Sequence, residues 1–189
     1  MSEVRHWAQS MLAPDAAVVL DVETTGLEGS IVEIAVIGAA TGAILLDTLV
    51  DPGPHTPIEA GAQALHGITT TDLIGAPTWA DMLPSLHRVT AGRTILAYNA
   101  VFDRGRILHD CAGAGLDPGP LADEHRWQCV MVRRCQALGT DIRVPLDGGH
   151  RARGDVKATR DLLHLLAAGH TDRAGHAALA LRQTTKGIA

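Results

Sequence analysis

The chain has 189 residues, of which 46% are hydrophobic and 20% are charged, and its formal net charge is −5. This composition predicts one folded domain and excludes an intrinsically disordered protein, because a disordered chain carries too few apolar residues to build a core. Three cysteines, Cys111, Cys129 and Cys135, form no Cys-x-x-Cys pair, which is typical of buried, reduced thiols in a cytoplasmic protein.

The first part of the chain predicts one helix and three strands. Residues 1–14 are expected to form a short helical extension that packs on the domain through Trp7, Met11 and Leu12. Apolar runs follow, and short segments rich in glycine, threonine and proline separate them. We therefore expect strands at residues 18–23, 31–37 and 43–50, joined into an antiparallel meander.

Two carboxylates, Asp21 and Glu23, end the first of these strands with a single residue between them. Side chains alternate faces along a strand, so both point to the same side. At about 4 Å and an effective dielectric near 20, two like charges repel by roughly 4 kcal/mol. Such a pair favours a bound cation, and oxygen ligands without a nearby thiolate favour Mg²⁺ or Mn²⁺ over zinc. The alternative is a pair of solvated surface carboxylates, which is the commoner origin of an isolated Asp-x-Glu.

The middle of the chain is expected to form a loop, two helices and a fourth strand. Residues 51–62 contain prolines and glycines and are expected to form a loop. A short helix is expected at Thr69–Leu73. A longer helix is expected at Thr78–Val89, with Thr78 as its N-cap and with Pro84 kinking or shortening it. Residues 94–98 read as a fourth strand.

Asn99 and Asp103 follow that fourth strand at the expected start of a helix. Asn99 is a good N-cap residue, and Asp103 would then lie in the first turns of the helix. In α/β folds, strand ends that lead into helices are the usual place for functional sites. The alternative is structural, because a carboxylate near a helix N-terminus also stabilises the helix dipole.

The last third predicts two helices separated by loops. We expect loops at residues 113–123 and 139–149, a helix at 127–138 and a second helix at 153–168 that ends at Gly169. The remaining tail, residues 169–189, is expected to add one weak helix. No internal repeat and no apolar stretch of membrane-spanning length is present, so no membrane partner is expected.

His150 and Asp155 lie around the start of the second helix. They are five residues apart, which corresponds to about 140° around an ideal helix, so they could not share a helical face. The two side chains converge only if His150 belongs to the loop and Asp155 to the helix.

The charge is unevenly distributed. Residues 1–125 carry 5 Lys and Arg against 16 Asp and Glu, whereas residues 126–160 carry 8 against 3. An acidic part would then house a metal site, and the basic segment could hold phosphates. The alternative is that these arginines only solvate a helix face.

Three motifs in this order resemble the DEDDh exonucleases over residues 15–168. They are the sequence DVETTG at residues 21–26, Asn99-x-x-x-Asp103, and His150-x-x-x-x-Asp155. The resemblance implies an α/β fold of the ribonuclease H-like type, with three antiparallel strands and then parallel strands in one mixed sheet flanked by helices. Residues 15–168 would form the exonuclease domain, between the extension at 1–14 and the tail at 169–189.

The same resemblance implies hydrolysis of single-stranded DNA or RNA from the 3′ end with release of nucleoside 5′-monophosphates. Two Mg²⁺ or Mn²⁺ ions would be held by Asp21, Glu23, Asp103 and Asp155. His150 would be the general base, in keeping with the ability of histidine to exchange protons near neutral pH. The positions that match the family's substrate-binding residues are Thr24, Thr25, Gly26, Leu27, His66 and Asn99.

Three functional hypotheses are compatible with the motifs. The first is a free-standing 3′→5′ exonuclease that carries the intact set of five catalytic residues. The second is a proofreading-type subunit with a polymerase partner. The third is a non-catalytic nucleic-acid-binding module that uses the basic segment, with salt-dependent and metal-independent affinity.

Overall fold

A computed structural model describes residues 2–170 and 172–186, and in this part five strands form one mixed sheet. The strands are β1 (Ala17–Thr24), β2 (Ile31–Gly38), β3 (Ile44–Leu49), β4 (Thr94–Ala97) and β5 (Trp127–Cys129), in the spatial order β3-β2-β1-β4-β5. The first three pair antiparallel, whereas β4 runs parallel to β1 and β5 parallel to β4. The predicted α/β class, with three antiparallel strands followed by parallel ones, is confirmed.

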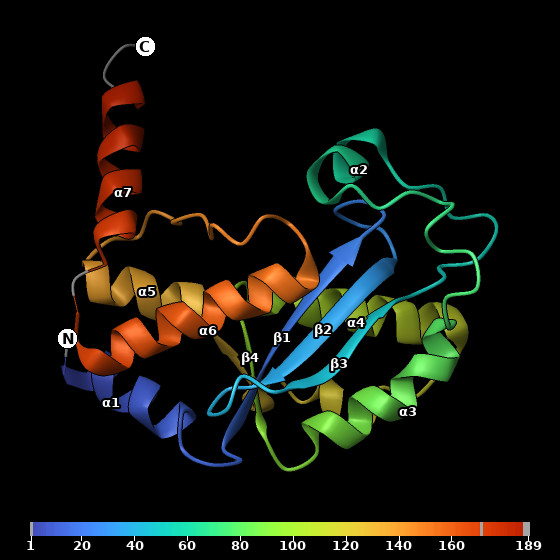
Figure 1. Ribbon diagram of the computed structural model, residues 1–189, viewed down its shortest axis with the longest axis horizontal. Coiled ribbons are helices and arrows are strands. Elements are labelled where there is room, and N and C mark those ends of the chain that lie inside the picture. The colour runs from blue at the N-terminus through green and yellow to red at the C-terminus, as the bar shows by residue number, and fades with distance from the viewer. Residues whose placement is uncertain (1, 171, 187–189) are drawn as a thin grey trace.

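Helices cover both faces of this sheet (Figure 1). The described helices are α1 (Ser2–Met11), α2 (Ala60–His66), α3 (Trp79–Thr90), α4 (Ala100–Ala114), α5 (Val130–Leu138), α6 (Ala152–Ala168) and α7 (Arg173–Lys186), with two short 3-10 helices, η1 (Gly119–Ala122) and η2 (Glu124–Arg126). In Figure 1, α6 crosses in front of the sheet, α4 lies behind it, and α7 points away from the rest. Each described helix is too short or too polar to cross a membrane.

The central strand β1 separates two hydrophobic cores. Val18, Leu20 and Val22 pack with α3 and α4 on one face. Val19 packs with α1 and α6 on the other face. A strand buried on both faces reads as a continuous apolar run, as residues 17–20 do. Because side chains alternate, Asp21 and Glu23 continue the face of Val19 and are directed toward α6.

Helix α3 bears on two predictions, one about its N-cap and one about Pro84. Thr78 caps it, and a reciprocal capping box joins Thr78 to Asp81. Pro84 lies inside the helix but does not shorten it, since α3 continues to Thr90. The helix tolerates the lost backbone bond because it buries an apolar face that includes Met82, Leu83 and Leu86.

Three local predictions are wrong. The segment Thr69–Leu73 is a turn rather than a helix. The helix of this region is α2, which already begins at Ala60, inside the expected loop 51–62. The expected helix 127–138 begins only at Val130, because residues 127–129 form β5 beside β4. A three-residue strand that runs directly into a helix leaves no separate periodic signal in the sequence.

The N-terminal helix is part of the packed domain. Val4 and Ala8 of α1 are buried in the core that includes α6, and the predicted contacts Trp7, Met11 and Leu12 are partly buried around them. The tail contains α7, as expected, and its residues after Lys186 lie outside the described part of the chain. The boundaries of the exonuclease domain at residues 15 and 168 stay a prediction.

Candidate active site

Asp21 and Glu23 lie at the end of β1, where the strand leaves the sheet. Across the ladder, Asp21 pairs with Ala35 and Glu23 pairs with Glu33, and the register shifts immediately after Glu23. Bulges at the end of a ladder redirect the side chains that follow them. Ligand atoms of Asp21, Glu23 and Asp155 lie within 4.8 Å of one another. The first two carboxylates of the predicted set are therefore joined by a third from a distant helix.

Asp103 approaches the same strand from the first turn of α4. Its side chain is buried, and its Oδ1 accepts a hydrogen bond of 3.2 Å from the backbone N–H of Val22, the residue between Asp21 and Glu23. Asn99 is the N-cap residue of α4, as predicted, but its side chain makes no capping hydrogen bond. The amide of Asn99 is thus left for other contacts, whereas Asp103 is fixed against β1.

Asp155 and His150 converge in the way that the sequence analysis required. His150 precedes α6 in a loop conformation with φ of 53°, and Asp155 lies in the first turn of the helix. The backbone N–H of His150 donates a hydrogen bond to the Asp155 carboxylate. His150 is exposed to solvent next to this carboxylate.

The four carboxylates share an electrostatic environment that disfavours their ionisation without a cation. Burial, followed by the charges of Asp103 and Asp155, raises the pKa of Asp21 well above its ordinary value. Burial and the charge of Asp155 raise the pKa of Glu23 to about 8, and burial raises that of Asp103 to about 7. Burial also raises the pKa of Asp155. Desolvation and like charges are the standard causes of such shifts.

These residues fit a divalent cation. Asp155 Oδ1 is buried and has no hydrogen-bond partner among the described residues. A buried carboxylate oxygen without a partner costs free energy unless a positive group completes it. Oxygen donors from several carboxylates at one point are the set that Mg²⁺ and Mn²⁺ prefer. The acidic cluster of Asp21, Glu23 and Asp155 is consistent with a metal site.

The loop before His150 passes so close to α6 that it requires glycine. A Cβ on Gly148 would lie 1.7 Å from Asp155 Oδ1, and a Cβ on Gly154 would lie 2.4 Å from the carbonyl oxygen of Gly148. Protein interiors do not accommodate contacts of this kind without movement. Gly154 therefore permits the loop to cross the first turn of the helix.

We expect Gly154→Ala to destabilise the protein and to lower the exonuclease activity implied by the sequence motifs at least tenfold, because the added methyl group displaces the loop that carries His150. Alanine normally stabilises a helix interior by about 0.5–1 kcal/mol relative to glycine. Gly105→Ala in α4 is the matched control, since nothing lies within 4 Å of its Cβ position, and it should raise stability. Urea unfolding measures the stability of both variants, and degradation assays measure their activity. Equal stability and equal activity of Gly154→Ala and Gly105→Ala would contradict the role given to Gly154.

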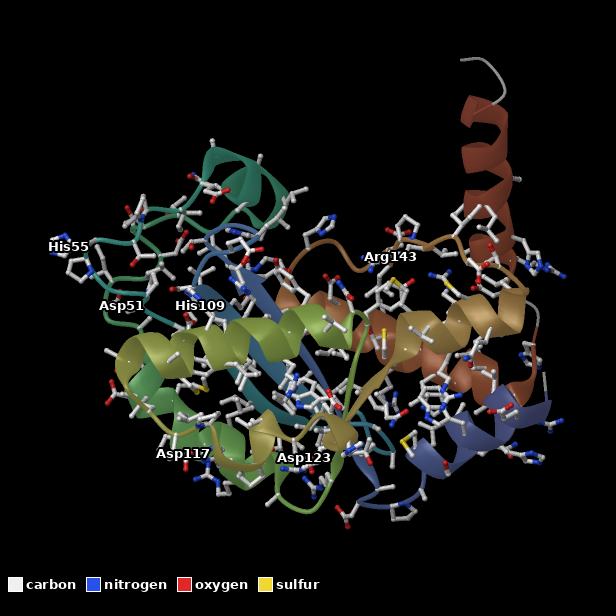
Figure 2. The ribbon with its side chains drawn as sticks, turned by 180° about the vertical axis from the view of Figure 1, so that it is seen from behind. Asp51, His55, His109, Asp117, Asp123 and Arg143 are labelled. Atoms are coloured by element: carbon white, nitrogen blue, oxygen red, sulfur yellow. The ribbon has the colours of Figure 1, made fainter. Side chains whose placement is uncertain are left out.

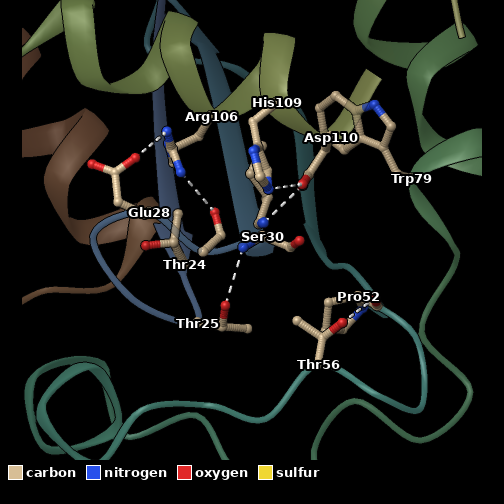
Figure 3. A network of polar contacts seen from close by, with 12 residues as sticks. Thr24, Thr25, Glu28, Ser30, Pro52, Thr56, Trp79, Arg106, His109 and Asp110 are labelled. Carbon is tan, nitrogen blue, oxygen red and sulfur yellow. Dashed lines mark hydrogen bonds and ion pairs between the residues drawn. The ribbon is translucent and has the colours of Figure 1, made fainter. Parts of the chain in front are cut away.

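A polar network holds the turn between β1 and β2 (Figure 3). Arg106 donates to the carbonyl of Gly29 at 3.3 Å and to Glu28 at 3.1 Å. Asp110 accepts from the backbone N–H of Ile31 at 2.8 Å. Thr25 Oγ1 accepts from the N–H of Ser30 at 3.0 Å. This network fixes the shape of the turn that carries the predicted substrate-binding residues 24–27.

The predicted substrate-binding residues divide into exposed and buried ones. Leu27 is 78% exposed in the turn that follows β1, an unusual exposure for a large apolar side chain. Thr24 and Thr25 are buried, and Thr24 donates to the Gly26 carbonyl at 2.7 Å. His66 is buried with one ring nitrogen 3.2 Å from the Thr24 carbonyl and the other accepting from Ile68 at 3.0 Å. The ring of His66 thereby joins the end of α2 to the end of β1.

Two residues beside the cluster were not singled out in the sequence. Glu33 on β2 is buried, and its carboxylate accepts from Arg151 and from the backbone N–H of Ala152. A lone carboxylate in the otherwise apolar strand 31–37 was the available signal for Glu33. Arg151, next to His150, carried no signal apart from its position.

A second cluster anchors the loop between α5 and α6. Arg134 is buried and pairs with Asp172 at 2.5 Å, and it also donates to the Pro145 carbonyl at 2.9 Å. The hydroxyl of Tyr98 donates to the Val144 carbonyl. Burial alone would raise the pKa of Asp172, but hydrogen bonds from Arg134 and from the backbone of residue 175 outweigh it and hold the pKa below its ordinary value. The loop that leads to His150 is thus tied to β4, α5 and the start of α7.

Comparison with protein families finds a match to the family RNase_T, described as exonuclease, over residues 18–163. Exonuclease CP81 of Escherichia phage 186, which is uncharacterized, is 32% identical over 82% of this chain and 90% of its own length. An epsilon-like DNA polymerase III protein of Rhodobacter capsulatus is 33% identical, but the chain spans only 24% of it. A PolC-type DNA polymerase III of Bacillus cereus is 30% identical, and the chain spans 12% of it.

Solved structures agree with these sequence relatives. Exonuclease X in complex with 5′ overhanging duplex DNA is 27% identical, with a TM-score of 0.52, over 86% of this chain and 98% of that one. The nuclease domain of 3′hExo, a DEDDh family member bound to rAMP, has a TM-score of 0.59 over 82% of this chain and 93% of that one. Its identity is 18%, so this likeness concerns the fold.

Proposed function

Because this chain belongs to the RNase T family of DEDDh 3′→5′ exonucleases, we propose that it removes nucleotides from the 3′ end of single-stranded DNA or RNA in a metal-dependent reaction. One observation carries the proposal. Carboxylates from β1 and α6 converge at the end of β1, Asp103 of α4 is bound to Val22 between the two β1 carboxylates, and Asp155 Oδ1 is buried there without a partner among the described residues. A packed protein retains such a cluster chiefly where a cation completes it.

The proposed ligands are Asp21, Glu23, Asp103 and Asp155. When bound, two Mg²⁺ or Mn²⁺ ions would activate the attacking water and stabilise the leaving 3′ oxygen. The Asp103 carboxylate accepts from the Val22 N–H and the Asp155 carboxylate accepts from the His150 N–H, so both need little reorganisation to bind. Preorganised ligands of this kind contribute more to catalysis than flexible ones.

His150 is the proposed general base. An imidazole nitrogen of His150 takes a proton from the attacking water while the water oxygen forms a bond to phosphorus. The bond from phosphorus to the 3′ oxygen breaks, and that oxygen takes up a proton, which leaves a nucleoside 5′-monophosphate and a shortened strand. His150 is exposed beside Asp155 and therefore accessible to substrate and solvent. Proton transfer by a positioned side chain is worth about 10²–10⁴ in rate.

The terminal nucleotide is proposed to lie against residues 24–27, His66 and Asn99. Leu27 presents a large exposed apolar surface to the base, and the Asn99 amide has no capping bond to give up. Thr24 and Thr25 are buried, so they are proposed to contact the nucleotide mainly through their backbone. Recognition of one end through an apolar side chain and backbone groups would tolerate different bases.

A proofreading-type subunit is the second candidate function, and the PolC-type relative is the observation that favours it. Co-purification of the tagged chain with a polymerase from its native host is the test.

Most of the basic segment, residues 126–160, is already engaged in contacts within the chain, which argues against a non-catalytic binding module. Six of its eight basic residues contact other groups, namely Arg126, Arg133, Arg134, Arg151, Arg153 and Arg160. Arg143 lies on the α5–α6 loop (Figure 2), and no hydrogen bond or ion pair of Arg143 is found among the described residues.

The test is degradation of 5′-labelled single-stranded DNA and RNA with Mg²⁺, with Mn²⁺ and with chelator. We expect a metal-dependent ladder that descends from the 3′ end and is absent for Asp103→Ala. Asp161→Ala, an exposed carboxylate on α6, is the control that should behave like the wild type. Binding without cleavage, unchanged by chelator and by Asp103→Ala, would contradict the proposal.

A further inference from the structure

Glu33 is a buried carboxylate that the acidic cluster does not use. It lies on β2 directly opposite Glu23 and is only 4% exposed. The ligand atoms that converge belong to Asp21, Glu23 and Asp155, and Glu33 is not among them. A buried charge is retained at this cost only when it is paired and hydrogen-bonded. The partners of Glu33 therefore indicate what it does.

All of these partners belong to the start of α6. Arg151 Nε lies 3.1 and 3.0 Å from the two Glu33 oxygens, and Arg151 Nη2 lies 2.5 Å from Oε1. The backbone N–H of Ala152 donates to Glu33 Oε2 at 2.9 Å. Both oxygens are thus occupied by the residues that begin the helix.

Glu33 supplies the N-cap that the helix lacks. Arg151 occupies the N-cap position of α6 and makes no side-chain capping bond. A carboxylate that accepts from the first N–H groups of a helix replaces such a cap and also stabilises the helix dipole. Here the cap comes from a strand 119 residues earlier in the chain, which fixes the helix end to the sheet.

The residues fixed in this way flank the two side chains of the proposed site. His150 immediately precedes Arg151, and the N–H of Asp155 donates to the Arg151 carbonyl at 2.9 Å. His150 has a left-handed backbone conformation, which a residue other than glycine keeps only when its surroundings impose it. The Glu33 contacts lie one residue away and are well placed to impose it.

We propose that Glu33 is a positioning residue for hydrolysis, which holds Arg151 and the N-terminus of α6 and thereby sets the place of His150 beside the carboxylate cluster. The inference rests on the proposed function, because it assumes that His150 is the general base. It assigns Glu33 no contact with substrate or metal. Loss of hydrogen-bonding partners around a functional residue usually costs 10–100-fold in activity.

The test combines Glu33→Gln with His150→Ala in a double-mutant cycle. We expect Glu33→Gln to lower kcat about 10–100-fold in the wild-type background, with KM and the Mn²⁺ affinity changed by less than about threefold. In the His150→Ala background the same substitution should change the residual single-turnover rate by less than about threefold, because the side chain that it positions is gone.

Asp47→Asn is the matched control. Asp47 also pairs with an arginine of the first turn of α6, Arg153, at 3.4 Å, but Asp47 is more exposed than Glu33, and within the described residues it has no hydrogen bond to the helix backbone. The Asp47→Asn variant should be as active as the wild type. An unchanged kcat for Glu33→Gln, or an equal loss with and without His150, would overturn the inference. If the wild-type chain cleaves no substrate, the proposed function fails instead.

Discussion

Asp21→Asn should lower kcat at least about 10³-fold and, in chelator-treated protein, raise the thermal unfolding midpoint. The loss of rate follows from the removal of one charged ligand from the proposed metal site. Metal ions supply several kcal/mol of charge stabilisation in such reactions, and about 4 kcal/mol corresponds to 10³ in rate.

The gain in stability has the opposite origin. Burial and the charges of Asp103 and Asp155 raise the pKa of Asp21 in the folded chain. An acid whose pKa is raised by folding destabilises the folded state at every pH above its pKa in the unfolded chain, so at pH 7 the Asp21 carboxyl group opposes folding. Asparagine removes this charge at nearly constant size. A rise of about 2–4 °C would correspond to about 1 kcal/mol in a chain of this length.

Differential scanning calorimetry in chelator, together with initial rates in Mn²⁺, measures both effects. Asp161→Asn, on the exposed side of α6, controls for the loss of one negative charge from the whole chain. Retention of rate within tenfold of the wild type, or a lower unfolding midpoint of the metal-free variant, would show that Asp21 does not belong to a strained metal site.

His150→Ala should lower kcat by about 10²–10⁴ and leave metal binding intact. The expected loss is the usual contribution of a general base. The cation ligands are carboxylates of other residues, so Mn²⁺ should still raise the unfolding midpoint of the variant as much as that of the wild type. A reduced rate together with preserved Mn²⁺ binding separates proton transfer from metal binding.

His164→Ala is the control for this experiment. His164 is an exposed histidine on α6, so it shares the helix and the side-chain chemistry of the test position. Rates measured with a saturating single-stranded DNA or RNA substrate should be unchanged for His164→Ala. If His150→Ala retained more than a third of the wild-type rate, another group would have to accept the proton.

The sequence predicted the parts of the site that local rules determine. Period-two alternation placed Asp21 and Glu23 on one face, and the ladder confirms this geometry. The helical angle between His150 and Asp155 required one loop residue and one helix residue, which is the arrangement observed. Asp103 at the start of a helix after β4 followed from strand and helix signals. The roles of these residues came from the resemblance to the DEDDh exonucleases and stay predictions.

The contacts that the sequence did not predict connect distant parts of the chain. Glu33 and Arg151 are separated by 118 residues, so no local pattern pairs them. The place of α2 was missed because its seven residues follow a loop rich in proline and glycine. Strand β5 was missed because its three residues depend on pairing with β4 rather than on their own propensity. Tertiary contacts determine these features.

The most direct test of the metal site is anomalous scattering from crystals grown with Mn²⁺ and a nucleoside 5′-monophosphate. We expect two Mn²⁺ peaks, about 3.5–4 Å apart, between the carboxylates of Asp21, Glu23, Asp103 and Asp155, with His150 directed at the phosphate. Mn²⁺ peaks only at other residues, in protein that degrades DNA under the same conditions, would contradict the assignment of these four carboxylates as the catalytic ligands.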